Sequence, residues 1–212
     1  MKEGNNLTEV TRIVTGAIQE NCYLVSSQHN TLIIDPGADA WRIIQTIDDK
    51  KLKPRAILLT HAHCDHIGAV TELRQHYHIP VYMNEKEREW LSNPELNLSL
   101  ALYGEPIICE EAEFNLDIQH CERCLGDIHF KMIPTPGHTE GGVSLLFDDF
   151  IMTGDTLFYH SIGRTDFPTG NKEQLLDSIH QQLLTLYDDL IVYPGHGKET
   201  TIGEERAHNP FL

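Results

Sequence analysis

Short runs rich in β-forming residues follow one another closely at the start of the chain. Three of them are separated by only a few turn residues: Thr11–Thr15, Asn21–Ser26 and Thr31–Asp35. Connections this short leave no room for a crossover helix, so we expect the chain to begin with antiparallel strands.

Helical periodicity appears after these strands. It predicts helices at four places: Ala40–Leu52, Ile67–Tyr77, Asn84–Leu91 (a short charged helix) and Asn171–Tyr187. In the first helix the residues expected near one face are Trp41, Ile44, Ile47 and Leu52. In the last, Asn171 is the expected N-cap, and a buried stripe is expected at Leu175, Ile179, Leu183 and Leu186.

Further apolar β runs end in loops of small residues that carry His or Asp. The runs are Ala56–Thr60, Phe130–Thr135, Val143–Phe147, Phe150–Thr153 and Leu190–Tyr193, and the loops that follow read HAHCDH, PGHT, GDT and PGHG. If these strands share sheets, their loops gather at one edge, where layered α/β proteins usually place a site. The order of strands and helices suggests two sheets between helical layers.

Composition and charge narrow the class of protein. The chain has 212 residues, of which 40% are hydrophobic, and no composition break divides it, so we expect one domain over residues 1–212. The formal net charge of −16 argues against nucleic acid and anionic membranes as partners. The N-terminus lacks an apolar signal-like segment, and the cysteine count of five is odd, so we expect a cytoplasmic protein with reduced thiols.

The motif HAHCDH places four potential metal ligands within six residues: His61, His63, Asp65 and His66. Imidazole and carboxylate suit zinc, and also iron or manganese. His61 and His63 stand two residues apart just past a strand and can face one ion. Asp65 and His66 then point elsewhere, so a second ion is expected.

Three later residues can complete two metal sites, because each follows a strand in a glycine-containing loop: His138, Asp155 and His196. The predicted sets are His61, His63 and His138 for one ion, and Asp65, His66 and His196 for the other. The Asp155 carboxylate would bridge the two. Two cations about 3.5–4 Å apart lower the pKa of a water held between them, so the protein needs no separate nucleophile.

These motifs resemble those of the metallo-β-lactamase-fold hydrolases, and within them the short, single-domain glyoxalase II-like proteins. The resemblance covers about Thr11 to Leu212, and its further markers are IIDPG at 33–37, TGDTLF at 153–158, GRTDFPTG at 163–170 and the ending NPFL. It implies an α+β fold, an αββα sandwich of two mixed β-sheets flanked by helices. It also implies two divalent metal ions, most simply Zn²⁺, and hydrolysis of a small thioester such as S-D-lactoylglutathione.

The resemblance also suggests roles for single residues. Asp65 would hold or receive the proton of the bridging water, so Asp65 and Asp155 are the expected catalytic carboxylates. Asp35 either supports a metal ligand or only forms a turn with the proline after it. Arg164 either meets a substrate carboxylate or forms an ordinary ion pair, and Lys198 is a weaker candidate.

Two cysteine features are given less weight. Cys121 and Cys124 form a CxxC with His120 and His129 nearby, which fits a zinc or redox site but more simply a turn between short strands. Cys64 lies between predicted ligands and is expected to be a bystander.

Other functions share the motif. Persulfide dioxygenases carry HxHxDH and bind one iron ion, so an oxidoreductase of that kind is the main alternative. β-Lactam hydrolysis is disfavoured because those enzymes are normally exported. A non-catalytic metal-binding module would show an incomplete ligand set, and the set here is complete.

Overall fold

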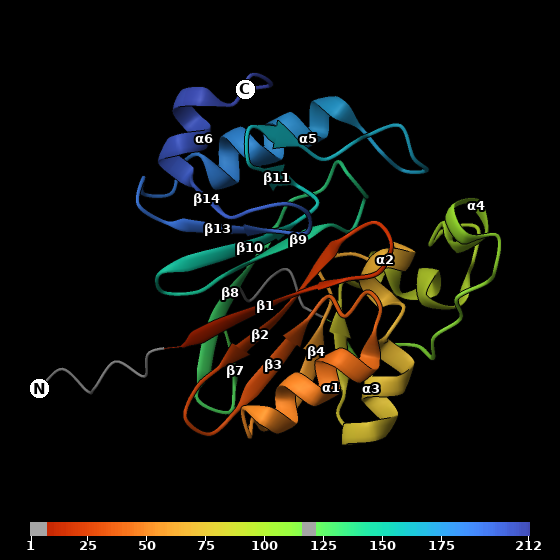
Figure 1. Ribbon diagram of the computed structural model, residues 1–212. Coiled ribbons are helices and arrows are strands. Elements are labelled where there is room, and N and C mark those ends of the chain that lie inside the picture. The colour runs from red at the N-terminus through yellow and green to blue at the C-terminus, as the bar shows by residue number, and fades with distance from the viewer. Residues whose placement is uncertain (1–7, 116–121) are drawn as a thin grey trace, which may run out of the picture.

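Two six-stranded sheets lie face to face in a computed structural model that describes residues 8–115 and 122–212 (Figure 1). The first sheet has the order β1 (Glu9–Thr15), β2 (Glu20–Ser26), β3 (Thr31–Ile34), β4 (Pro54–Leu58), β5 (Val81–Met83) and β6 (Phe114–Asn115). Its first three strands are antiparallel, as predicted, and the later pairs are parallel because helical segments connect them.

The second sheet has the order β14 (Thr200–Thr201), β13 (Ile191–Pro194), β10 (Phe150–Gly154), β9 (Val143–Leu146), β8 (Ile128–Pro134) and β7 (Glu122–Leu125). Strands β10 and β13 are parallel and the other pairs antiparallel, so this sheet is also mixed. A separate hairpin joins β11 (Leu157–Phe158) to β12 (Ser161–Ile162).

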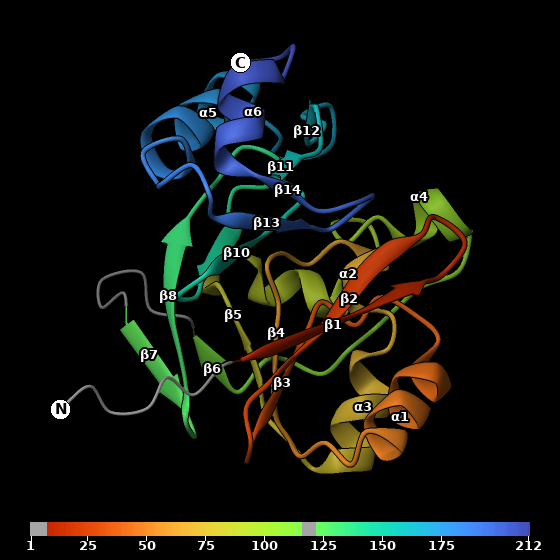
Figure 2. The same cartoon turned by 60° about the vertical axis from the view of Figure 1, so that its left-hand side comes forward.

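Helices cover the outer face of each sheet (Figures 1 and 2). On the first sheet lie α1 (Ala40–Asp49) and α3 (Val70–Tyr77), and on the second lie α5 (Lys172–Ser178) and α6 (Ile202–His208). Two shorter helices, α2 (Cys64–Ile67) and α4 (Ser99–Tyr103), lie at one end of the molecule. The predicted αββα sandwich is confirmed.

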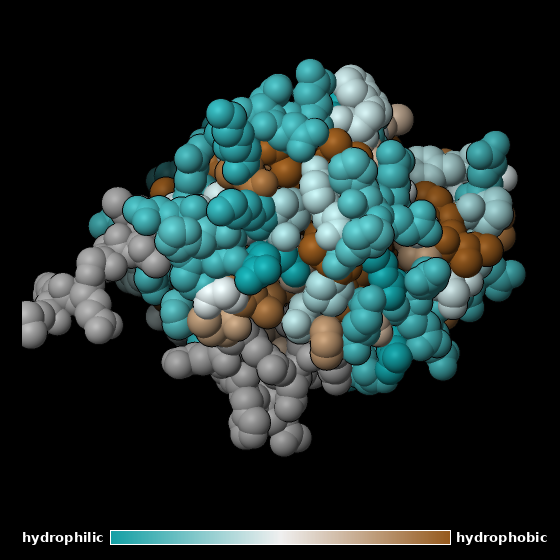
Figure 3. Space-filling view, turned by 90° about the horizontal axis from the view of Figure 1, so that it is seen from below, coloured by the Kyte–Doolittle hydropathy of each residue, from teal (hydrophilic) through white to brown (hydrophobic). Residues whose placement is uncertain are grey.

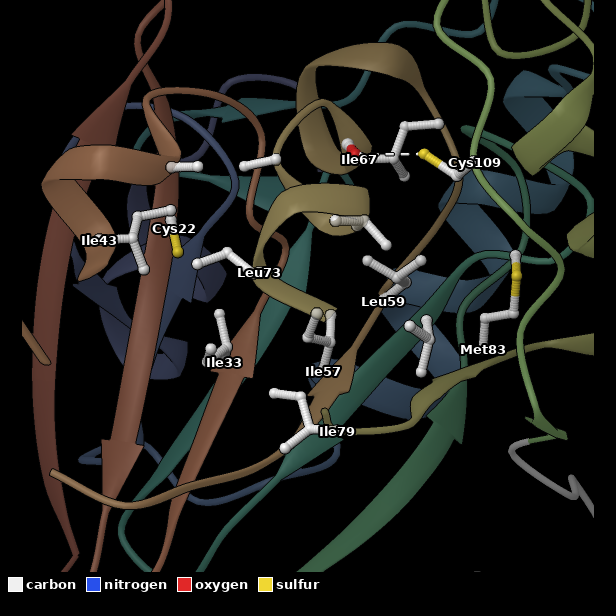
Figure 4. Packing of buried hydrophobic residues seen from close by; sticks show 14 of the residues in the cluster. Cys22, Ile33, Ile43, Ile57, Leu59, Ile67, Leu73, Ile79, Met83 and Cys109 are labelled. Atoms are coloured by element: carbon white, nitrogen blue, oxygen red, sulfur yellow. Dashed lines mark hydrogen bonds between the residues drawn. The ribbon is translucent and has the colours of Figure 1, made fainter. Parts of the chain in front are cut away.

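The alternation of side chains along β3 and β4 builds two cores from one sheet. Leu32 and Leu58 point inward and pack with Phe130 and Leu145 of the opposite sheet. The intervening side chains, such as Ile33, point outward against α1 and α3, and Figure 4 shows this outer packing with Ile43 and Leu73. Strands that are buried on both faces are continuously hydrophobic, which explains the runs AILL and LII.

The face of α1 differs from the prediction. The helix buries Ala40, Ile43 and Ile47, whereas the Trp41 side chain is 63% exposed. The buried positions follow the i, i+3, i+7 spacing of one helical face, and Trp41 lies one residue, about 100°, away from it. Ile44 is half-buried at the edge of this face.

The helix predicted for Ile67–Tyr77 is α3, which begins only at Val70, and Ile67 is the last residue of the separate helix α2. Gly68 separates α2 from α3, and a side chain there would collide with the backbone carbonyl of Gly37. The backbone N–H of Ala69 donates to the Pro36 carbonyl at 2.9 Å, which fixes the break against the loop after β3.

Two other helices depart from regular α geometry. Residues Glu85–Ser92 form a 3₁₀ helix, capped by Asn84, where a short α-helix was predicted. The predicted helix Asn171–Tyr187 is α5 followed by a π-helical turn at Ile179–Leu183, and Leu175, Ile179 and Leu183 are buried as expected. Among the described residues, no helix has the length and apolar character that crossing a membrane requires.

Asn171 caps the N-terminus of α5, the helix against which Gly137 of the PGHT loop packs. Its side chain accepts a hydrogen bond from the backbone N–H of Gln174 at 3.0 Å, and its own N–H donates to the Gly137 carbonyl at 2.8 Å. Asn171→Ala is expected to lower the free energy of unfolding by about 1 kcal/mol in urea denaturation, because one helix-end N–H loses its partner. Asn171→Asp keeps the cap and serves as the control, and equal unfolding midpoints for all three proteins would contradict the assignment.

Candidate metal centre

The predicted ligands come from loops that leave both sheets at the same edge of the sandwich. His61 and His63 lie between β4 and α2, and Asp65 and His66 lie within α2. The other three follow strands of the second sheet: His138 after β8, Asp155 directly after β10 and His196 after β13. The structure brings all seven together, as the sequence predicted.

The first group consists of His61, His63 and His138. Their ring centres lie 4.7–5.0 Å apart, and His63 Nδ1 is 2.9 Å from His138 Nε2. All three side chains are buried. Each offers one nitrogen within a sphere that one metal ion can occupy.

The second group consists of Asp65, His66 and His196. Asp65 Oδ2 lies 3.0 Å from His196 Nε2 and 3.6 Å from His66 Nε2. These atoms likewise lie close enough together to hold one ion. The short helix α2 is what turns Asp65 and His66 toward this group, while the extended loop before it presents His61 and His63 to the other.

Asp155 lies between the two groups. Its Oδ2 is 3.6 Å from His138 Nε2 in the first group and 3.7 Å from His196 Nε2 in the second, and its Oδ1 is 3.4 Å from His66 Nε2. A side chain at position 195 would run into Asp155 Oδ1 and the His66 ring, so the glycine of PGHG is required for this close approach.

Unpartnered buried atoms test whether this arrangement suits metal ions. Among the described residues, His61 Nε2, His66 Nε2 and Asp155 Oδ1 are buried and have no hydrogen-bond partner. Leaving such atoms unpaired costs about 1–3 kcal/mol each, and more for charged groups. Imidazole and carboxylate donors that converge without partners fit divalent metal ions well.

The opposite nitrogens of three histidines are already bonded, which sets their tautomers. His66 Nδ1 donates to Asp35 Oδ2 at 3.1 Å, and His138 Nδ1 donates to the Arg164 carbonyl at 2.7 Å. His61 Nδ1 lies 3.1 Å from Thr60 Oγ1, whose own hydrogen goes to Asp35 at 2.5 Å. When neutral, each of these rings therefore carries its hydrogen on Nδ1 and turns the Nε2 lone pair toward the cluster, as a metal ligand must.

Asp35 thus supports the site rather than only forming a turn. Its Oδ1 accepts the backbone N–H of Thr60 at 2.7 Å, and its Oδ2 accepts from Thr60 Oγ1 and His66. Its backbone has a left-handed φ of 47°, a conformation that is uncommon outside glycine and more frequent for Asp than for most residues. Asp35 therefore both bonds to cluster residues and lies in the turn that leads into Pro36.

Burial and neighbouring charges set the protonation of the cluster. Burial lowers the pKa of His63 to about 3 and that of His61 well below its usual value, so both rings are neutral and able to bind a cation. Burial alone would also lower the pKa of His66, but the carboxylates of Asp65 and Asp155 raise it well above its usual value. Metal binding at His66 therefore has to displace a proton.

Glu87 is a supporting residue that the sequence reasoning missed. It is fully buried, its Oε2 accepts the N–H of Ala62 at 2.7 Å, and its Oε1 accepts the N–H of Gly141 at 2.9 Å. It therefore joins the HAHCDH loop to the loop that carries His138. Burial raises the pKa of the Glu87 carboxyl to about 7, against the effect of these hydrogen bonds.

The other candidates lie at the margin of the cluster or away from it. The exposed Arg164 forms a two-point ion pair with Asp166, both contacts at 2.7 Å, so the ordinary ion pair is present. The ammonium of Lys198 lies 3.5 Å from the centre of the Tyr159 ring. Burial raises the pKa of the Cys64 thiol to about 12, which fits a bystander more than a thiolate ligand.

The CxxC motif lies partly outside the described residues, which do not include Cys121 or His120. Cys124 is exposed in β7. Its thiol lies 2.9 Å from the Gly126 carbonyl and 3.7 Å from His129 Nε2. Strands β7 and β8 pair directly here, which agrees with the simpler reading of short strands.

Glu87→Gln tests the link between the two loops. The amide nitrogen of Gln cannot accept a hydrogen bond in any state, so one buried N–H loses its partner, and the free energy of unfolding should fall by about 1–3 kcal/mol. Glu89→Gln is the matched control, since Glu89 is exposed in the same 3₁₀ helix. Chemical denaturation of the two variants compares them, and equal stabilities would show that the link is not needed.

Comparisons with known proteins agree with this geometry. Residues 15–196 match the Metallo-beta-lactamase superfamily. The chain is 44% identical to the probable metallo-hydrolase YqgX of Bacillus subtilis over 203 residues, covering 95% of this chain and 96% of that protein. It is 39% identical to the hydroxyacylglutathione hydrolase GloC of Haemophilus influenzae over 201 residues, covering 92% and 94%.

A solved structure extends the likeness to the backbone. The crystal structure of the BLEG-1 B3 metallo-β-lactamase superposes with a TM-score of 0.93 at 44% identity, covering 96% of this chain and 99% of that chain. The family match, the relatives and the αββα fold point the same way. The chain belongs to the metallo-β-lactamase superfamily of metal-dependent hydrolases.

Proposed function

We propose that this protein is a binuclear metal-dependent hydrolase that cleaves thioesters of the S-acylglutathione class, such as S-D-lactoylglutathione. The observation that carries the binuclear part is the position of Asp155, which contacts histidines of both groups. The thioester part is supported by the likeness to a hydroxyacylglutathione hydrolase at 39% identity.

The ligand sets follow from the two groups. His61, His63 and His138 would hold one ion, Asp65, His66 and His196 the other, and Asp155 would bridge them. Zinc suits these donors best, and iron or manganese would also be accommodated. Two such ions supply a water of lowered pKa and polarise the carbonyl under attack.

Asp65 and Asp155 are the carboxylates that would accept the proton of that water. Asp65 and Asp155 both line the open pocket beside the cluster, so both can reach a water positioned over it. Burial would raise the pKa of each carboxyl, but the neighbouring histidines, His66 above all, lower it below its usual value. Each is therefore ionised and able to accept a proton during attack on the thioester.

Arg164 is the substrate-binding residue in this proposal. Arg164 lines the same pocket, and its own backbone carbonyl accepts the hydrogen bond from His138 Nδ1. A carboxylate of the thiol carrier would compete with Asp166 for it, since the Arg164–Asp166 pair is exposed and easily exchanged.

Removing the bridge is the sharpest test of the metal assignment. Asp155→Ala should abolish loading of both ions and turnover, because the two groups lose their shared carboxylate and three histidines lose a counter-charge. Elemental analysis of purified protein measures the loss, and circular dichroism checks the fold. Asp149→Ala, an exposed change in the turn before β10, should retain both ions; a fully loaded and active Asp155→Ala protein would refute the bridge.

A substrate panel tests the reaction. The metal-loaded protein should release free thiol from S-D-lactoylglutathione, lose this activity to a chelator and regain it on adding Zn²⁺. One iron per chain with oxygen uptake on glutathione persulfide, and no thiol release, would favour the dioxygenase instead. A chromogenic β-lactam belongs in the same panel, because a solved B3 β-lactamase is 44% identical.

A further inference from the structure

A pocket of about 350 Å³ opens directly beside the metal cluster. Its floor is formed by cluster residues, and its walls by Ile18, Leu98, Leu102, Phe158, Ile162, Arg164 and Phe167. Ligand sites commonly span about 300–1,000 Å³, so this one is small. It has room for one part of a substrate next to the reacting bond, and the remainder must lie outside.

The walls are apolar and come from separate parts of the chain. Ile18 belongs to the turn between β1 and β2, Leu98 and Leu102 to the α4 segment, and Phe158 and Ile162 to the β11–β12 hairpin. Ile18 and Leu102 are each 44% exposed although they are large and hydrophobic. Figure 3 shows hydrophobic surface gathered on the side of the molecule where α4 lies in Figure 1. Apolar surface beside a polar cluster is typical of a binding site.

Arg164 is the one cationic side chain among the described residues that line the pocket, apart from the cluster histidines. Its guanidinium is paired with Asp166 and lies 4.0 Å from the centre of the Phe167 ring. The Phe167 ring also meets His63 in a T-shaped contact, with the two ring centres 5.6 Å apart. Phe167 thus contacts both the charged rim and a cluster histidine, and the wall residues other than Arg164 carry no charge.

This composition decides which half of the substrate can enter. The glutathione half of an S-acylglutathione carries carboxylates and an ammonium group, and burying these against Leu and Phe without partners is costly. The acyl half carries no such groups. The charged half fits at the rim beside Arg164, and the acyl half fits inside.

Resting on the proposed function, we infer that the pocket binds the acyl group and makes the enzyme prefer thioesters with an apolar acyl chain over the hydroxylated lactoyl group. The reaction consumes one water: the carbon–sulfur bond breaks, a carbon–oxygen bond forms, and a carboxylic acid and a thiol are released. The apolar walls add binding to the acyl chain without taking part in that exchange.

A series with one constant thiol tests this preference. S-acetyl-, S-butyryl-, S-hexanoyl- and S-D-lactoylglutathione are compared by thiol release with the metal-loaded protein. A fully buried CH₂ contributes about 0.8 kcal/mol, or roughly fourfold in kcat/KM. We expect kcat/KM to rise at least tenfold from acetyl to hexanoyl, and the lactoyl thioester to fall near the acetyl value.

Two leucines of α4 provide a matched pair of variants. Leu102 lines the pocket, whereas Leu100 is 45% exposed on the same helix and does not line it. Leu102→Ser should reduce the hexanoyl-to-acetyl ratio of kcat/KM at least threefold, and Leu100→Ser should leave the ratio unchanged. Inhibition by the product acids should follow the same order. Hexanoate should bind the parent protein more tightly than acetate does, and this difference should be smaller in Leu102→Ser.

The outcomes separate the two proposals. Thioester hydrolysis with no gain from acetyl to hexanoyl, or with equal effects of the two leucine variants, overturns the acyl-pocket inference and leaves the proposed function standing. Absence of thiol release from every member of the series overturns the proposed function, and the inference falls with it.

Discussion

The constraint on which this structure depends is the burial of ionisable side chains at one edge of the sandwich. Histidine nitrogens and carboxylate oxygens meet there without enough hydrogen-bond partners among themselves. Leaving such atoms without partners is costly, and a bound cation would satisfy them. Every neighbouring feature can be understood as a means of holding these groups in place despite that cost.

The means are mostly backbone contacts from distant parts of the chain. Asp35 fixes the start of the HAHCDH loop and the His66 ring, and Glu87 fastens the same loop to the PGHT loop of the other sheet. Because Glu87 joins loops that follow strands of different sheets, the bonds that fix the HAHCDH loop also tie the two sheets together. Fold and site are therefore not separate in this part of the protein.

The residues of the cluster could be predicted from the sequence because their signal is local. HAHCDH, PGHT, GDT and PGHG each follow a β run, and that placement was sufficient to bring seven side chains together. The strands of both sheets were also evident, since continuous apolar runs reflect burial on both faces. Asp35 could be given two roles from its position, and the structure shows both.

The remaining features depend on tertiary contacts that no short pattern records. Glu87 reads as one more charge in the run EKERE, and only the fold shows that it is buried. The break at Gly68 follows from contact with Gly37, and the exposure of Trp41 follows from which face of α1 meets the sheet. The pocket walls come from segments such as the β1–β2 turn and α4, which meet only in the folded protein.

One residue serves the site through its backbone and the pocket through its side chain. The Arg164 carbonyl accepts the hydrogen of His138 Nδ1, while its guanidinium faces outward at the rim. A carbonyl is present whatever the side chain, so a substitution at this position changes the charge at the rim and keeps the acceptor of His138 Nδ1 in place. The charge at the mouth of the pocket can therefore vary in evolution independently of the hydrogen bond that orients His138.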